Sequence, residues 1–228
     1  MLTSLDSGVV IIPPENVDFP RENTVCITGH REKHITPYQG RPEFLRLTVT
    51  AVRLMLAKYI DMAAEKGYIR FISGLATGTD TWAAIHVIKM KSAGQPVELI
   101  GAMPFLRHSS SLTPAQHEEL SKIERCCKQL YCTATDPAST YNSAGGHNIY
   151  RTRNYFMVDH ASVVVGFYEP RISRSGTAQT VNYANRRGRT VRTFGLGDVF
   201  RIMDTTGPDI DLIARHIRGL DNVFDMPF

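Results

Sequence analysis

The sequence has little cysteine, only a small excess of one charge and no long apolar run. Its 228 residues include four cysteines, too few for a disulfide framework in a chain of this length. Three of them, Cys126, Cys127 and Cys132, lie close together but lack the second cysteine or histidine pair that completes a zinc site. We therefore expect reduced thiols and no metal.

The charge balance and the hydropathy pattern exclude several classes of protein. Lysine and arginine number 26 against 22 acidic residues, an excess of +4 that is too small to indicate nucleic-acid binding but suits a small anionic ligand. No apolar run approaches the ~18 residues that span a bilayer. The first twenty residues lack a basic region and are interrupted by Pro13 and Pro14, so they do not resemble a signal peptide. We expect a cytoplasmic protein without a membrane partner.

Hydrophobic residues make up 43% of the chain and charged residues 21%, a composition typical of globular proteins. The length favours one domain. We expect a leader arm over residues 1–22 and a single domain over 23–228. Residues 135–147 are rich in serine, glycine, asparagine and proline and are predicted to form a loop.

Short apolar runs alternate with segments of helical periodicity. The runs, rich in β-branched residues, predict strands at 24–28, 68–72, 97–103, 130–133, 161–167 and 189–194. Apolar residues spaced three and four apart, with proline, threonine and glycine at the ends, predict helices at 42–66, 79–92, from 113 onward, 149–160, 176–187 and 208–219. The alternation predicts an α/β, Rossmann-like fold, with a mainly parallel sheet and helices on both faces. In such a sheet the loops after the strands meet at one edge, where ligands bind.

The first loop with distinctive chemistry is Thr28-Gly-His-Arg31. A glycine at a strand end permits close approach of the backbone to a ligand, and His30 and Arg31 can then reach an anion. The alternative is a glycine turn with solvated basic side chains.

The second loop, Ser73-Gly-Leu-Ala-Thr-Gly-Thr-Asp80, precedes a helix whose amino-terminal amides can bind phosphate. Asp80 either caps this helix or accepts hydrogen bonds from ribose hydroxyls. The loop is not a P-loop, because no Gly-Lys-Ser/Thr follows.

The third loop, Arg174-Ser-Gly-Thr177, again offers amides and a hydroxyl at a helix start. Arg153 and Asn154 lie on the helix before the preceding strand, and we favour a role for them in binding. The alternative is an amphipathic helix with a solvated arginine.

Three motifs, in this order, resemble the YpsA-like branch of the SLOG superfamily, which also includes LOG phosphoribohydrolases and DprA-like proteins. They are Cys26-Ile-Thr-Gly-His-Arg31, Ser73-Gly-Leu-Ala-Thr-Gly-Thr-Asp-Thr-Trp-Ala-Ala84, and Arg153-Asn-Tyr-Phe-Met-Val-Asp159 with Ser175-Gly-Thr177. The resemblance spans roughly residues 24–194 and implies a Rossmann-like fold with a nucleotide-derivative pocket. LOG enzymes cleave the N-glycosidic bond of nucleoside monophosphates with an arginine and a glutamate, and Arg153 resembles that arginine. The glutamate is replaced here by Gln179 and Thr180, which cannot supply its charge.

We therefore expect a binding protein or sensor for a nucleotide or ADP-ribose-like phosphate ligand, with no certain cofactor beyond such a bound nucleotide or ADP-ribose derivative. One alternative is an enzyme of N-glycoside or phosphoribosyl chemistry that uses Asp159 or Glu169, and a second is a DprA-like DNA-binding module. Catalytic residues stay unassigned, and relatives suggest a homodimer. The expected ligand-binding residues are Gly29, His30, Arg31, Ser73, Gly74, Thr77, Gly78, Asp80, Arg153, Asn154, Asp159, Ser175, Gly176 and Thr177.

Overall fold

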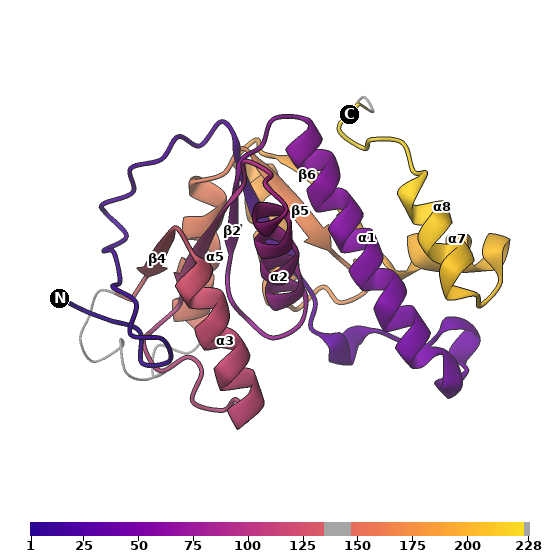
Figure 1. The fold of residues 1–228 in the computed structure, drawn as a ribbon, viewed down its shortest axis with the longest axis horizontal. Coiled ribbons are helices and arrows are strands. Elements are labelled where there is room, and N and C mark those ends of the chain that lie inside the picture. The colour runs from indigo at the N-terminus through magenta and orange to yellow at the C-terminus, as the bar shows by residue number, and fades with distance from the viewer. Residues whose placement is uncertain (135–146, 226–228) are drawn as a thin grey trace.

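The computed structural model describes residues 1–134 and 147–225, and within them it contains a six-stranded sheet in which every strand is parallel to its neighbours (Figure 1). The strand order is β4-β3-β2-β1-β5-β6. The strands are β1 (Thr24–Gly29), β2 (Arg70–Ser73), β3 (Glu98–Met103), β4 (Gln129–Cys132), β5 (Val163–Phe167) and β6 (Thr190–Phe194). This confirms the predicted parallel α/β fold, including the adjacency of the four central strands.

Helices cover both faces of the sheet because successive strand side chains point to opposite sides. Val25 and Ile27 of β1 face a core shared with α1, α2, α3, α7 and α8, whereas Cys26 faces α5 and α6. The helices are α1 (Leu45–Glu65), α2 (Thr79–Ser92), α3 (Pro114–Cys126), α5 (His147–Asp159), α6 (Gly176–Arg186), α7 (Leu196–Thr206) and α8 (Ile210–Arg218). Within the described ranges, none of these helices is both long and apolar enough to cross a membrane.

Two segments differ from the sequence-based expectation, and a third lies mostly outside the residues that the structure describes. The helix predicted from residue 42 begins as a 3₁₀ turn, Pro42–Phe44, before α1. Helix α7 was not predicted, although the Asp198 carboxylate accepts a 2.7 Å hydrogen bond from the Gly195 amide at its start. Most of the predicted loop 135–147 lies outside the described residues.

The amino-terminal arm runs along the edge of the sheet formed by β4. The Ile12 amide donates a 2.8 Å hydrogen bond to the Leu130 carbonyl, and Ile12 forms a parallel bridge with Tyr131. Ile11 is 5% exposed and belongs to the main core. The arm therefore covers backbone groups that an edge strand would otherwise leave unpaired.

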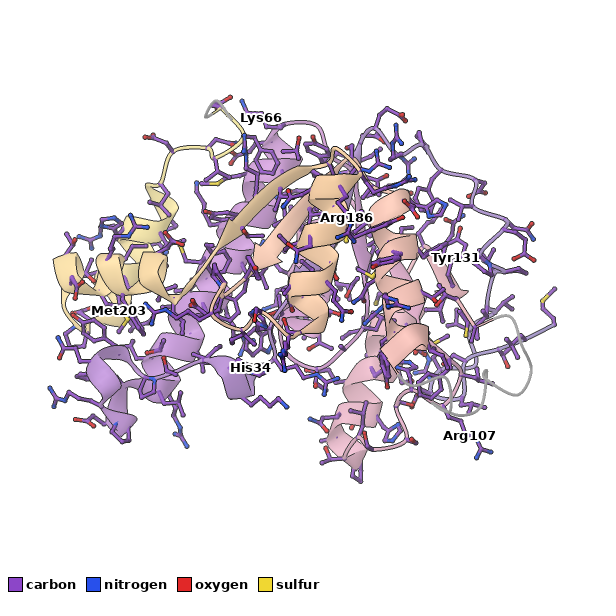
Figure 2. The ribbon with its side chains drawn as sticks, turned by 180° about the vertical axis from the view of Figure 1, so that it is seen from behind. His34, Lys66, Arg107, Tyr131, Arg186 and Met203 are labelled. Atoms are coloured by element: carbon purple, nitrogen blue, oxygen red, sulfur yellow. The ribbon has the colours of Figure 1, made fainter. Side chains whose placement is uncertain are left out.

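All strands run in the same direction, so the loops that follow them lie at one edge of the sheet. Figure 2 shows Lys66, which precedes β2, at the top of the view and His34, which follows β1, well below it. The three predicted loops follow β1, β2 and β5, which are neighbours in the order β2-β1-β5. The topology thus places them at one edge, the carboxyl edge.

Helix α3 begins with a capping box in which Thr113 and Gln116 exchange side-chain and backbone hydrogen bonds. We predict that Thr113→Ala lowers the free energy of unfolding by about 1 kcal/mol, because the Gln116 amide loses its acceptor. Urea unfolding measures this loss as a lower transition midpoint, provided that the slope of unfolding free energy against urea concentration is unchanged. Thr50→Ala, an exposed threonine in α1, is the control, and an equal loss there would contradict the capping role.

Candidate functional site

The loops after β1 and β2 pack directly against each other. Thr79 Oγ1 donates a 2.7 Å hydrogen bond to the His30 carbonyl, and a Cβ on Gly29 would lie 2.3 Å from the Thr79 methyl carbon. Gly78, with φ +96°, faces the backbone of Arg31. The predicted reason for glycine at position 29, close approach to a ligand, is therefore corrected: the neighbouring loop occupies that space.

Arg153 enters this edge from α5 and is buried, with 6% exposure. Its Nη1 donates to the Gly74 carbonyl and lies 3.7 Å from Asp80 Oδ2. A longer contact of 3.5 Å reaches the Ala102 carbonyl of β3. A Cβ on Gly74 would overlap this guanidinium at 1.6 Å, so Gly74 is required by the arginine. The alternative of a solvated arginine at position 153 is excluded.

Asp80 lies in the first turn of α2 but does not cap it, since the N-cap is Gly78 and Asp80 Oδ2 instead accepts from the Ala76 amide at 3.4 Å. Burial raises the pKa of Asp80, and the charge of Arg153 opposes this shift. Burial likewise lowers the pKa of Arg153, against the attraction of Asp80. Each group offsets part of the desolvation of the other, as a buried ion pair must.

The loop after β5 is joined to the same arrangement by Asn154. Its Nδ2 donates to the Gly176 carbonyl at 3.4 Å, and the preceding residue, Arg153, donates to the Gly74 carbonyl. The amino terminus of α6 is capped by Ser175, whose Oγ accepts from the Ala178 amide at 3.1 Å. Consecutive side chains of α5 therefore connect the second loop to the third.

Helix α2 differs from α6 at its amino terminus, because no side chain caps it in the described structure. The first amides of a helix need partners and carry partial positive charge. Arg31 is exposed nearby, and its charge acts on the pKa values of both Asp80 and Arg153. The Thr81 amide already donates to the Ala76 carbonyl at 3.2 Å, so this end of α2 combines the two preceding amides, of Thr79 and Asp80, with an exposed guanidinium.

His30 is 2% exposed, and within the described residues its Nε2 has no hydrogen-bond partner. Its ring stacks on Tyr168 at 6.0 Å between centroids and meets Phe167 edge-on. Burial lowers the pKa of His30, and a hydrogen bond with the Glu169 backbone opposes this shift without overcoming it. Tyr168 was missed from the sequence because no motif marks it.

Asp159 is not part of this group. It ends α5, before β5 begins, and its carboxylate pairs with Tyr183 and with Arg187, 2.9 Å from the Nε. Arg187 precedes β6, so this cluster lies toward the amino ends of the strands. The structure therefore places Asp159 apart from the other predicted residues, because a helix that precedes a parallel strand runs back along it and carries its last turn away from the carboxyl edge.

The remaining predicted residues fall into two sets. Ser73 and Thr177 are buried, and Ser73 Oγ donates to the Asp80 carbonyl at 2.9 Å. Thr77 is half-buried, and Gly176 is exposed. The structure therefore brings the predicted residues other than Asp159 to one edge, some as supports within the loops and some at the surface.

Breaking the buried pair tests its structural role. We predict that Arg153→Ala lowers the free energy of unfolding by about 3–5 kcal/mol, since Asp80 is left buried without its cation. The control is Arg187→Ala, which breaks a more exposed arginine–aspartate pair and costs about 1 kcal/mol or less. Denaturant unfolding gives both values. A smaller loss for Arg153 than for Arg187 would contradict the account.

Comparison with known proteins agrees with the motifs. The chain is 26% identical over 144 residues to an uncharacterized SPbeta prophage-derived protein, YoqJ, of Bacillus subtilis (strain 168), covering 58% of this chain and 78% of that protein. DNA processing protein A (DprA) from Streptococcus pneumoniae is a structural neighbour, with a TM-score of 0.47, 15% identity and coverage of 86% of this chain. The chain spans 61% of the length of that DprA chain. The sequence matches the YspA SLOG family over residues 25–196, and the chain belongs to that family.

Proposed function

We propose that the protein binds a phosphate-bearing nucleotide derivative, such as a nucleoside monophosphate or ADP-ribose, at the carboxyl edge of its sheet. The observation that carries the proposal is the uncapped amino terminus of α2, next to exposed Arg31. Backbone amides there would hold the phosphate without a large side-chain rearrangement. Gly176 and the start of α6, joined to this edge by Asn154, provide a second surface for the rest of the ligand.

His30 and Arg31 have different roles in this proposal. The His30 Nε2 is buried without a partner, so a ligand oxygen within reach would satisfy it. Arg31 supplies a permanent charge with planar geometry that suits phosphate. In this proposal Arg153 does not contact the phosphate through Nη1, which donates to the Gly74 carbonyl and lies 3.7 Å from Asp80 Oδ2. Its part is to hold the loops in place.

Substitution of Arg31 tests the phosphate contact. We predict that Arg31→Ala weakens binding of AMP or ADP-ribose roughly ten- to hundredfold, since a hydrogen bond to a charged group contributes about 1.5–3 kcal/mol. Isothermal titration calorimetry with each nucleotide measures the dissociation constant.

Lys33→Ala removes an exposed cation from the same loop and is the matched control. Its affinity should stay close to that of the wild type, because the backbone nearest Gly78 at the start of α2 is that of Arg31 and Glu32. Equal losses of affinity in the two variants would mean that general electrostatic attraction, and not a contact between Arg31 and the phosphate, explains the effect. Wild-type protein that binds neither nucleotide would overturn the proposal.

The site favours binding of the nucleotide without hydrolysis of its N-glycosidic bond. Gln179 is exposed, and Thr180 Oγ1 donates to the Gly176 carbonyl at 2.8 Å, so neither supplies a carboxylate at the start of α6. Glu169, a carboxylate considered for the enzyme alternative, has its Oε2 3.3 Å from the Leu196 amide. Asp159 is paired with Arg187.

We accordingly predict that the protein does not release adenine from AMP during hours of incubation. Chromatography of the free base checks this, on the sample used for calorimetry. Adenine release that scales with protein concentration and is lost in Arg31→Ala would establish the enzyme alternative instead. The DNA-binding alternative and the homodimer stay predictions.

A further inference from the structure

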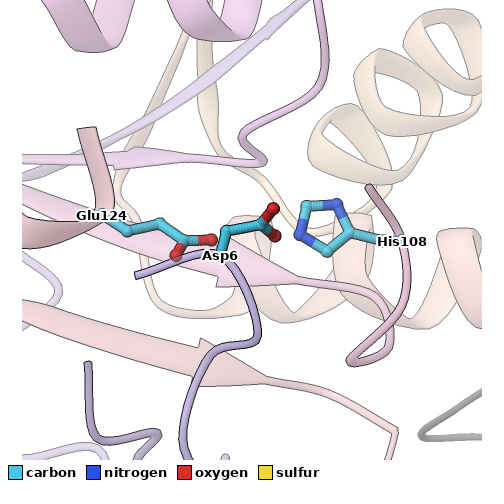
Figure 3. Close-up of side chains that lie close together, drawn as sticks. All are labelled: Asp6, His108 and Glu124. Carbon is cyan, nitrogen blue, oxygen red and sulfur yellow. The ribbon is translucent and has the colours of Figure 1, made fainter. Parts of the chain in front are cut away.

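Three side chains with metal-binding atoms meet beneath the amino-terminal arm. They are Asp6 of the arm, His108 of the segment after β3, and Glu124 in the last turns of α3. One ligand atom from each lies within 4.8 Å of the others. Figure 3 shows the Asp6 side chain between those of Glu124 and His108.

Two atoms of this cluster are buried without a hydrogen-bond partner within the described chain: Glu124 Oε1 and His108 Nε2. Glu124 is fully buried, and the side chain of Asp6 is 6% exposed. Buried polar atoms nearly always have a hydrogen-bond partner, because an atom without one loses its hydrogen bonds to water and gains none in return. Glu124 Oε1 and His108 Nε2 therefore have lone pairs that are available to a metal ion, and the carboxylate of Asp6 lies beside them.

The neighbouring hydrogen bonds orient these groups as supports orient metal ligands. Asp6 Oδ2 accepts from Ser109 Oγ at 2.7 Å, and Asp6 Oδ1 lies 2.5 Å from His117 Nδ1. Glu124 Oε2 accepts from Ser4 Oγ at 2.5 Å. Each carboxylate is therefore fixed by a side chain that is not itself in the group of three ligands.

We propose that Asp6, His108 and Glu124 bind a divalent ion of the zinc class. Two carboxylates neutralise the charge of such an ion, and the imidazole favours zinc and related transition metals over magnesium or calcium. Three protein ligands leave one position for water. The inference does not depend on the proposed nucleotide site, and it departs from the sequence-based expectation of no metal.

Binding would draw the three segments together. Ligand atoms around a tetrahedral zinc ion are about 3.4 Å apart, given bonds of about 2.1 Å, so a spacing of 4.8 Å must close by about 1.4 Å. Asp6 lies in an arm held by Ile12 and by the side-chain contacts of Ser4 and Asp6, whereas Glu124 is on a helix and fully buried. The ion would therefore fasten the arm to α3 and to the segment after β3.

The test uses the full chain, stripped with a chelator and then titrated with zinc against a competing fluorescent indicator. We expect wild-type protein to bind one zinc ion per chain, and Glu124→Gln to weaken binding at least tenfold. Glu118→Gln, on the exposed side of the same helix, is the matched control and should bind as the wild type does. Equal affinities for the two glutamine variants would overturn the proposal.

Further variants keep the result decisive if Glu124→Gln does not fold. Asp6→Asn leaves the sequence of α3 and of the segment after β3 unchanged and should also abolish binding, while circular dichroism shows the fold retained. His117→Asn, which removes a support, should weaken binding about 10- to 100-fold. Loss of zinc with His86→Asn, at a separate and half-buried histidine–aspartate pair, would assign the ion to that pair and overturn the proposal.

A second readout follows the arm itself. Zinc should slow cleavage of residues 1–22 by a protease in the wild type, and not in Asp6→Asn, because only the wild type closes the arm on the ion. Cobalt in place of zinc should give the visible absorption of a low-symmetry four-coordinate site. A wild-type protein with neither protection nor absorption would contradict the site even if zinc adheres.

Discussion

The structure of the carboxyl edge depends on a buried guanidinium. Arg153 of α5 can be buried only if partners replace its water, and it finds them in the Gly74 carbonyl, the Ala102 carbonyl and Asp80. These belong to the β2 loop, β3 and α2. One side chain therefore fixes a helix on one face of the sheet against a helix on the other face. Asn154, the next residue, extends the connection to the loop after β5.

This constraint decides which groups are left for a ligand. Glycine at position 74 makes room for the arginine, and Gly29 makes room for Thr79, so the glycines bring the loops together. The groups that remain at or near the surface are the half-buried Gly78 at the start of α2, the exposed Arg31 and the exposed Gly176 at the start of α6. Dense packing beneath the loops, with a helix start that no side chain caps and an exposed guanidinium above them, is the arrangement expected of a pre-organised binding edge.

Much of the fold was predictable because buried parallel strands are apolar and β-branched throughout, as at Val163–Phe167. The gathering of the three loops followed from strand direction alone. Side-chain partners did not: no spacing predicts that Arg153 reaches Gly74, or that Asp6 meets His108 and Glu124 from three distant segments. Helix α7 was missed because Gly195 and Gly197 conceal a short amphipathic pattern, whose buried positions are Leu196, Val199, Ile202 and Met203.

The central claim is that the carboxyl-edge loops, held by Arg153, form the phosphate-binding surface. The most direct measurement is a nuclear magnetic resonance titration of ¹⁵N-labelled protein with AMP or ADP-ribose, which reports each backbone amide separately. The account predicts that the largest shifts fall on the amides of Gly78, Thr79 and Gly176, with little change in α8. Shifts concentrated at the opposite edge, around Asp159 and Arg187, or an absence of shifts at the start of α2, would contradict it.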